Sequence, residues 1–365
     1  MVISSEGTEH LAEKQLSWLG MTLAEMEQVI SDLGEAKYRA GQLSDWIYRK
    51  NEHDFAKMSN LSAFLRSRLN EISRVDLPGV VELYQGINDP VTKALVCFQD
   101  EELAECVLMR YPYGNSVCVS TQVGCRMACR FCASGSDGFL RDLSAGEIVG
   151  QVLLLRSLLS GEGNSRISHL VFMGMGEPLD NIEQVIRVIQ IVNAPWGLGI
   201  GYRHITVSTC GLIEGIERLT ELNLPLNLAI SLHASDDDLR RELMPVAHKY
   251  KITDLIATAV RYSRVTGRRV TYEYGMIAGI NDKTSQAEQL ARLLKGSLSH
   301  VNLIPFNNWQ SETAQSAQQR SSPEVVAGFA ESLRKWGIEV TVRREMGADI
   351  SAACGQLRRS RRRGT

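Results

Sequence analysis

From about residue 115 onward, short apolar runs alternate with longer amphipathic segments. This alternation predicts six strands, at residues 117–123, 169–173, 204–208, 226–232, 269–276 and 300–305. Helices are expected between them at residues 145–159, 181–192, 213–222, 252–265 and 284–296, with one more helix and strand at 323–336 and 338–344. Repeated β–α units predict an α/β fold with a parallel sheet, wound open or closed into a barrel. In such barrels the turns at the carboxyl ends of the strands form the active site.

The chain before residue 115 has a different pattern. Apolar side chains recur at helical spacing in residues 23–33, 38–50 and 61–72, which predicts a small bundle of three helices. Residues 79–110 contain short runs that predict strands. We therefore expect an N-terminal helical accessory domain at 1–75, short connecting strands at 76–114, a barrel at 115–350, and a loop with a basic tail at 351–365.

Composition limits the classes of protein that this chain can belong to. It has 365 residues, of which 44% are hydrophobic, so it can bury a large core without disulfides. No apolar run approaches the roughly 20 residues of a membrane span, and no secretory signal pattern opens the chain, so we expect a cytoplasmic protein. The net charge of −2 argues against a general nucleic-acid coat. Any RNA contact must then come from local patches such as the arginine-rich tail at 358–363, whose simpler interpretation is a solvated tail.

Three of the eight cysteines, Cys125, Cys129 and Cys132, are spaced C-x3-C-x2-C just after the first predicted barrel strand. Three buried thiols would not need such tight spacing. A structural zinc usually takes four ligands in paired sets, although a catalytic zinc with three protein ligands fits the spacing. Three thiolates also suit a [4Fe–4S] cluster with one iron left open, because full protein ligation would take four cysteines.

Polar or glycine-rich turns follow several other predicted strands. The turn at 174–178 supplies close backbone approach and a carboxylate that can accept a hydrogen bond from an ammonium group. Strand ends at 208–211, 231–234 and 307 add hydroxyl, imidazole and amide groups to the same predicted mouth. The candidate cofactor-binding residues are Gly176, Glu177, Ser208, Ser231, Leu232, His233 and Asn307.

The cysteine triplet, with Phe131 before its third cysteine, is similar to the signature of the radical S-adenosylmethionine (radical SAM) enzymes. Over residues 20 to 358 the chain resembles the RlmN methyltransferases. The resemblance rests on the motifs Tyr38-Arg39-Ala40-Gly41-Gln42, Cys118-Val119-Ser120-Thr121-Gln122-Val123-Gly124-Cys125, the 174–178 turn and Ala352-Ala353-Cys354-Gly355-Gln356-Leu357. It implies a partial (β/α)6 radical SAM barrel, with Cys125, Cys129 and Cys132 holding a [4Fe–4S] cluster. It also implies two S-adenosylmethionine molecules per turnover, one as methyl donor and one as radical source.

The resemblance implies methylation of C2 of an adenine in 23S ribosomal RNA, the adenine-2503 equivalent, and for some family members adenine-37 of transfer RNA. Cys354 would take a methyl group, lose a hydrogen atom from it to the radical, and bond through that carbon to the base. Cys118 would release the product and form a disulfide with Cys354, and Glu105 matches the position of the proton acceptor. The scheme requires a reductant such as flavodoxin or ferredoxin, and a monomer is the default expectation.

Two alternatives stay open at this point. The sister Cfr type uses the same cysteines to methylate C8 of the same adenine. A non-catalytic metal-containing RNA-binding protein would keep the metal ligands without the radical chemistry.

Overall fold

The computed structural model describes residues 16–136, 138–161, 163, 165–306, 319–344 and 346–357. Ten of the strands in this part of the chain form one sheet, in the order β14-β13-β12-β11-β10-β9-β6-β5-β4-β3. From β6 to β14 neighbouring strands are parallel. The bounds of these parallel strands are Gly114–Cys118 (β6), Ile167–Phe172 (β9), Ile205–Thr209 (β10), Asn227–Ser231 (β11), Val270–Met276 (β12), Ser299–Pro305 (β13) and Glu339–Val342 (β14).

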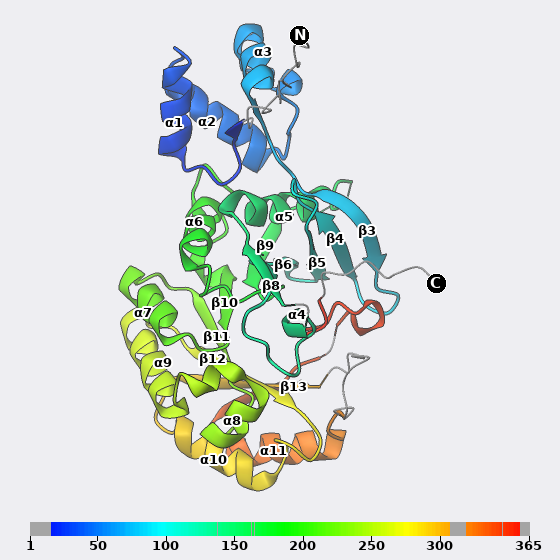
Figure 1. The fold of residues 1–365 in the computed structure, drawn as a ribbon, viewed down its shortest axis with the longest axis vertical. Coiled ribbons are helices and arrows are strands. Elements are labelled where there is room, and N and C mark those ends of the chain that lie inside the picture. The colour runs from blue at the N-terminus through cyan, green and yellow to red at the C-terminus, as the bar shows by residue number, and fades with distance from the viewer. Residues whose placement is uncertain are drawn as a thin grey trace, which may run out of the picture.

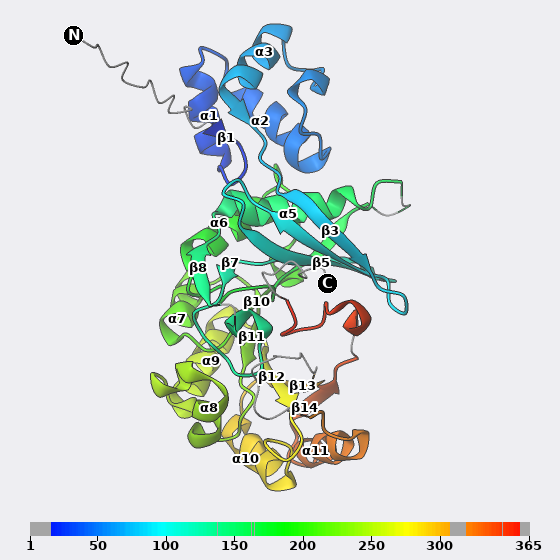
Figure 2. The ribbon, with the colours of Figure 1, turned by 45° about the vertical axis from the view of Figure 1, so that its right-hand side comes forward.

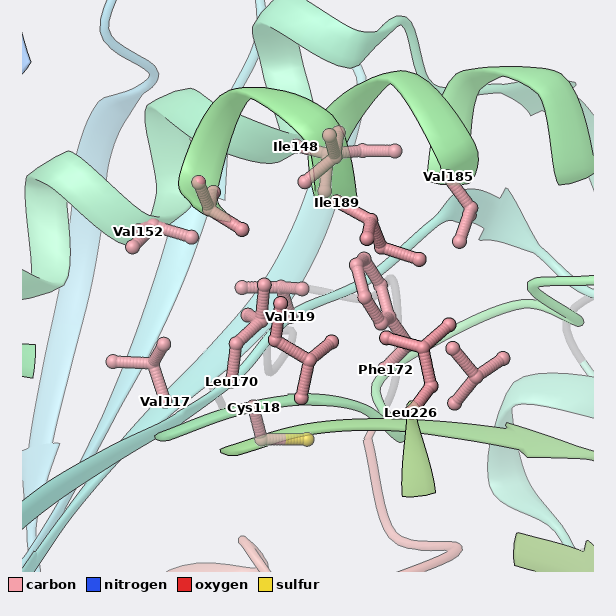
Figure 3. Packing of buried hydrophobic residues seen from close by; sticks show 14 of the residues in the cluster. Val117, Cys118, Val119, Ile148, Val152, Leu170, Phe172, Val185, Ile189 and Leu226 are labelled. Carbon is pink, nitrogen blue, oxygen red and sulfur yellow. The ribbon is translucent and has the colours of Figure 1, made fainter. Parts of the chain in front are cut away.

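Helices lie along the outer side of the curved parallel sheet (Figure 1). They are α5 (Ala145–Ser157), α6 (Ile182–Asn193), α7 (Ile213–Leu222), α8 (Asp237–Leu243), α9 (Ile252–Thr266), α10 (Thr284–Leu294) and α11 (Pro323–Lys335). The apolar faces of α5 and α6 pack on the sheet, whereas Cys118 lies on the side away from these helices (Figure 3). Successive side chains of a strand point to opposite faces, so alternate residues line the concave inner side. The predicted α/β architecture is confirmed.

The connecting segment continues the barrel sheet. Its strands β3 (Gly79–Gln85), β4 (Val91–Cys97) and β5 (Leu103–Tyr111) are antiparallel, and β5 pairs with β6 through Val107 and Cys118. Residues 105, 107, 109 and 111 therefore share the inner face with Cys118.

The N-terminal part contains the three predicted helices, α1 (Leu23–Asp32), α2 (Tyr38–Ser44) and α3 (Ala63–Ile72), with one π-helical turn at Asp45–Arg49. It is not purely helical, because two short parallel strands, β1 (Leu16–Ser17) and β2 (Ser73–Arg74), bring its ends together. Trp18, fully buried, donates a hydrogen bond to Ser73 Oγ at 2.8 Å across this junction. Arg156 of α5 donates to the carbonyls of Tyr48 and Arg49, which attaches these helices to the barrel.

The single strand predicted at 117–123 is wrong. β6 ends at Cys118, and residues 122–124 form β7 (Gln122–Gly124), which pairs with β8 (Phe139–Asp142) in a separate two-stranded sheet. Between β6 and β7 the backbone forms hydrogen bonds with the 174–178 turn. Val119 O accepts from Gly174 N–H at 3.1 Å, and Thr121 N–H donates to Met175 O at 2.9 Å. Helix α8 was also not predicted, because seven residues are too few to show a helical period. None of the helices in the described ranges has the length and apolar character needed to cross a membrane.

Candidate active site

The cysteine triplet lies in the loop between β7 and the short helix α4 (Ala133–Ser136). Cys125 N–H donates to Gly138 O at 3.1 Å, and Arg130 N–H donates to Leu243 O of α8 at 3.0 Å. These bonds fix both ends of the loop over the carboxyl ends of the barrel strands. Cys125, Cys129 and Cys132 are half-buried and line one cavity, here called the upper cavity.

Burial raises the pKa of the Cys125 thiol to about 12 and raises the pKa values of Cys129 and Cys132 as well. Without a metal these groups are therefore neutral thiols at neutral pH, and metal binding must release their protons. Within the described residues, no three His, Cys, Asp or Glu side chains converge on one point as ligands of a single ion would. In a four-iron cluster each thiolate binds a different iron, so thiols spread along the wall of a cavity fit that group.

The glycines of the 174–178 turn are required by close packing within the protein. A Cβ at Gly174 would lie 2.6 Å from Val119 C, and one at Gly176 would lie 2.6 Å from Gln122 Cβ. Gly176 also has a φ of +97°, which disfavours any other residue. The sequence suggested that these glycines admit a ligand. Both glycines line the upper cavity, but a side chain at either position would collide with other residues of the chain and not with a ligand.

Glu177 is only 4% exposed and lines the upper cavity beside the cysteine loop. Its two carboxylate oxygens accept from Leu179 N–H at 3.0 Å and from Cys210 N–H at 2.7 Å. Burial raises the pKa of this carboxyl, while the hydrogen bonds from the backbone oppose that rise. The side chains of Cys210 and Thr209 also hydrogen-bond to this carboxylate, so the chain uses part of its acceptor capacity and holds it at the wall of the upper cavity.

The other predicted strand-end residues differ in position. Ser208, Ser231 and His233 line the upper cavity, whereas Leu232 is fully buried and does not. His233 Nδ1 accepts from Gly275 N–H at 2.8 Å, and burial lowers the pKa of its ring to about 3, so the imidazole is neutral. Asn307 lies outside the described residues.

Cys118 and Cys354 come together although 236 positions separate them in sequence. Both line a second cavity, here called the lateral cavity, whose wall includes residues of β5 and β6, and Cys354 also lines the upper cavity. Burial raises the pKa of Cys118 to about 12, with the nearby Cys354 as the next cause. Cys354 thus lies between the three clustered cysteines and Cys118.

The loop that carries Cys354 is held from two sides. On one side, Gly355 O accepts from Ala133 N–H of α4 at 2.7 Å, and Leu357 O accepts from Ser134 Oγ at 2.8 Å. On the other side, Asp349 Oδ2 accepts from Ile87 N–H at 2.7 Å in the β3–β4 turn. Figure 2 shows this C-terminal segment, in red, beside β3 and β5.

Glu105 lies on β5 and is 6% exposed. It forms an ion pair with Lys93 Nζ at 2.9 Å, and the same ammonium donates to Ser351 O at 3.2 Å. Glu105 is not among the residues that line the upper or lateral cavity. The pair connects β4 and β5 to the Cys354 loop.

Two arginines near the site were not predicted. Arg343 follows β14 and lines both cavities, and the nearby Cys354 is the chief cause that raises the pKa of its guanidinium. Arg240 of α8 is fully buried and donates to Cys210 O at 2.5 Å, but its Nε and Nη1 have no hydrogen-bond partner among the described residues. Burial lowers the pKa of its guanidinium, and the nearby Cys210 and Cys129 oppose that shift. An arginine just after a strand or within a short helix is a weak sequence signal, so neither Arg343 nor Arg240 stood out from the other arginines.

Comparison with known families identifies two matching regions. Residues 16–75 match the family described as "Ribosomal RNA large subunit methyltransferase N-terminal domain", and residues 119–294 match the radical SAM superfamily. The described fold is therefore that of a radical SAM enzyme.

Comparison with individual proteins extends this match over nearly the whole chain. The chain is 46% identical over 342 residues to a Clostridium perfringens (strain 13) protein named "Probable dual-specificity RNA methyltransferase RlmN", covering 94% of this chain and 96% of that one. A Symbiobacterium thermophilum protein of the same name is 50% identical over 341 residues, covering 93% and 90%. The crystal structure of a radical SAM methyltransferase from Sphaerobacter thermophilus has a TM-score of 0.90 and 42% identity, covering 94% and 100%. The chain belongs to the RlmN family of radical SAM RNA methyltransferases.

Proposed function

We propose that this enzyme methylates C2 of an adenine in 23S ribosomal RNA, the adenine-2503 equivalent, through a methylated Cys354. The observation that carries the proposal is the position of Cys354, which lines both the upper cavity with the triplet and the lateral cavity with Cys118. One sulfur atom can there receive a methyl group from one side and be attacked by a second thiol from the other.

As a radical SAM enzyme the protein uses a [4Fe–4S] cluster and S-adenosylmethionine. We propose that Cys125, Cys129 and Cys132 hold the cluster, and that Glu177, Ser208, Ser231 and His233 bind S-adenosylmethionine in the upper cavity. Bound there, these groups supply a methyl group and a 5′-deoxyadenosyl radical. The neutral His233 and the acceptor oxygens of Glu177 suit the ammonium and hydroxyl groups of that cofactor.

The cysteines of the chain perform the remaining steps. Cys354 sulfur loses its proton and gains a methyl group, and the methyl carbon, after losing a hydrogen atom, bonds to C2 of the base. The base then loses its C2 proton to a protein acceptor, and the unpaired electron left on the ring returns to the electron-transfer chain. The thiolate of Cys118 attacks the sulfur of Cys354, which breaks the bond from sulfur to that carbon and leaves a disulfide, while the released carbon takes up a proton to complete the methyl group. Because burial holds the pKa of Cys118 near 12, the thiol needs a base before it can attack. An external reductant such as flavodoxin or ferredoxin must return two electrons to the disulfide.

Glu105 is proposed as a proton acceptor in this sequence. It shares the inner face of the β5–β6 pair with Cys118, because Val107, two residues further on, pairs with Cys118. Its carboxylate lies 2.9 Å from Lys93 Nζ, and a carboxylate oxygen is a possible proton acceptor. The names of the relatives describe dual specificity, so transfer RNA adenine-37 is proposed as a second substrate. The enzyme is proposed to act as a monomer.

The direct test is methylation of a 23S ribosomal RNA fragment by cluster-loaded, reduced protein, followed by mass spectrometry of the digested RNA. We expect 2-methyladenine at one position. An 8-methyladenine product would assign the Cfr type of reaction, and a protein that leaves S-adenosylmethionine intact would favour a non-catalytic RNA-binding role.

Three cysteine variants separate the proposed roles. Cys354→Ala should lose methyl loading of the protein, and Cys118→Ala should load normally but accumulate a covalent protein–RNA complex. The control is Cys97→Ala, a half-buried thiol on β4 that lines neither cavity. Methyl loading of Cys354→Ala, or normal product release by Cys118→Ala, contradicts the assigned role of that residue.

A further inference from the structure

We propose that the target nucleotide reaches the cysteines from the amino-terminal ends of the barrel strands, through a third cavity in which Tyr113 stacks on a base and Arg268 binds a backbone phosphate. This inference rests on the proposed function and names the part of the surface that binds the RNA. It concerns single-stranded or splayed-out RNA, because only an unpaired base can leave its helix and enter a barrel.

The third cavity, here called the lower cavity, has a volume of about 750 Å³ and is lined by the first residues of β11, β12 and β13 together with β5, β6 and β9. This volume lies in the range of sites that hold small-molecule ligands, which is roughly 300–1,000 Å³. Met173 and Arg343 line the lower cavity as well as the upper and lateral cavities. A nucleotide in the lower cavity therefore adjoins the space that Cys118 and Cys354 share.

The lower cavity favours an anion. Its lining includes three arginines, Arg268, Arg269 and Arg343, and one carboxylate, Glu273. Arg269 is paired with Glu339, and burial lowers the pKa values of the lining histidines. Arg343 interacts with Glu273, so among the described residues Arg268 is the lining cation without a carboxylate partner, and its Nη2 donates to Asn227 Oδ1 at 2.5 Å. Arg268 lies at the amino-terminal end of β12, where a flanking phosphate would pass.

An aromatic platform stands at the same opening. The rings of Tyr111 and Tyr113 are stacked, with centroids 4.9 Å apart and planes 8° from parallel. Tyr113 is 70% exposed although its neighbour is half-buried in the cavity wall, and its ring also meets the edge of His169. An exposed ring braced by a second ring is a preformed surface for a nucleobase, because every base has a face that can stack.

The carboxyl ends of the strands give a less direct path. There the cysteine loop is bonded to α8 through Arg130 N–H and Leu243 O, and the Cys354 loop is bonded to α4 through Ala133 N–H and Gly355 O. Both loops cover the end of the barrel where the cluster and S-adenosylmethionine bind. A base coming from that side would have to pass the cofactor before it could reach Cys118.

The test uses the full chain with its cluster loaded and a 23S ribosomal RNA fragment as the probe. Tyr113→Ala should weaken RNA affinity roughly 5- to 150-fold, the range for loss of one stacked base. Tyr113→Phe keeps the ring and should bind like the natural protein. Arg268→Gln should also weaken binding and lower the slope of log affinity against log salt by about 1, as loss of one phosphate contact does. Arg264→Gln, an exposed arginine of α9, is the matched control and should change neither quantity.

Methyl loading of Cys354 needs no RNA, so it reports separately on folding and on the cofactor site. Weaker RNA binding by Tyr113→Ala and Arg268→Gln with normal methyl loading supports the lower cavity as the entrance. If both variants bind RNA with the affinity and salt slope of the natural protein, the lower cavity is not the entrance. That result leaves the proposed function intact as long as the natural protein methylates RNA. A natural protein that loads Cys354 but methylates no RNA instead defeats the proposed function.

Discussion

Replacing Lys93 with methionine should destabilise the fold and loosen the Cys354 loop together. Lys93 and Glu105 are each 7% exposed at the side chain and lie 2.9 Å apart, so Lys93→Met removes a buried cation from beside the Glu105 carboxylate. Removal of one partner from a buried pair typically costs about 3–5 kcal/mol. For 365 residues the unfolding entropy is about 0.8 kcal/mol per kelvin, so Tm should fall by roughly 4–7 °C.

The same substitution removes the hydrogen bond from Lys93 to Ser351 O, one of the bonds that hold the Cys354 loop. Methyl loading of Cys354 should therefore slow at a temperature where the variant is still folded. Thermal unfolding followed by circular dichroism gives the first quantity, and transfer of a labelled methyl group to the protein gives the second.

The matched control is Lys335→Met. Lys335 and Glu331 lie 3.0 Å apart but are 71% and 66% exposed at the side chain, so the change in Tm should be below about 1 °C. A Tm change in Lys93→Met no larger than in Lys335→Met would refute the argument that burial makes the Lys93–Glu105 pair matter. Partial recovery of Tm in the double variant Lys93→Met with Glu105→Gln would show that the loss of charge balance at Glu105 is the cause.

Three further predictions follow from the site. Gly176→Ala should lower Tm and cofactor retention more than Gly199→Ala. Both glycines have a positive φ, but only at Gly176 does the new Cβ meet the protein, 2.6 Å from Gln122 Cβ. Equal losses in the two variants would contradict this explanation. Since burial raises the pKa of Cys118 to about 12, its alkylation rate, followed by peptide mass spectrometry, should rise about tenfold per pH unit from pH 7 to 10. A plateau near pH 9 would show an ordinary thiol. Arg240→Met removes a buried charge that has two nitrogens without a hydrogen-bond partner among the described residues. The variant should therefore raise the Tm of cluster-free protein by roughly 1–5 °C and lower iron uptake on reconstitution. A lowered Tm would contradict the expected gain in stability.

Local sequence patterns were sufficient to predict the parallel α/β sheet, whereas its barrel form was implied only by the family resemblance. Strand–helix alternation gave the parallel strands and their helices, because each unit buries one apolar face on the same sheet. The pattern failed at residues 117–123, where a continuous β-like run is interrupted because residues 119–121 bond to the 174–176 turn. That interruption depends on a segment more than 50 residues away, which no local period can show.

The site was predictable where one motif carries it and not where distant segments meet. The triplet and Glu177 lie in short motifs, and the structure places them around one cavity. The pairing of Cys118 with Cys354 came from family resemblance, since its geometry depends on Lys93 and the β3–β4 turn holding the last loop. Arg240 is identified only by its burial and Arg343 only by the cavities that it lines, and both are properties of the folded chain.

The central claim is that the carbon delivered to RNA passes through Cys354. Protein preloaded with a deuterium-labelled methyl group on Cys354, then freed of the labelled donor, should be given unlabelled S-adenosylmethionine, reductant and a 23S ribosomal RNA fragment for one turnover. The account predicts labelled methyl on the adenine and a Cys118–Cys354 disulfide in the protein. Unlabelled methyl on the RNA, with the label still on Cys354, would contradict it.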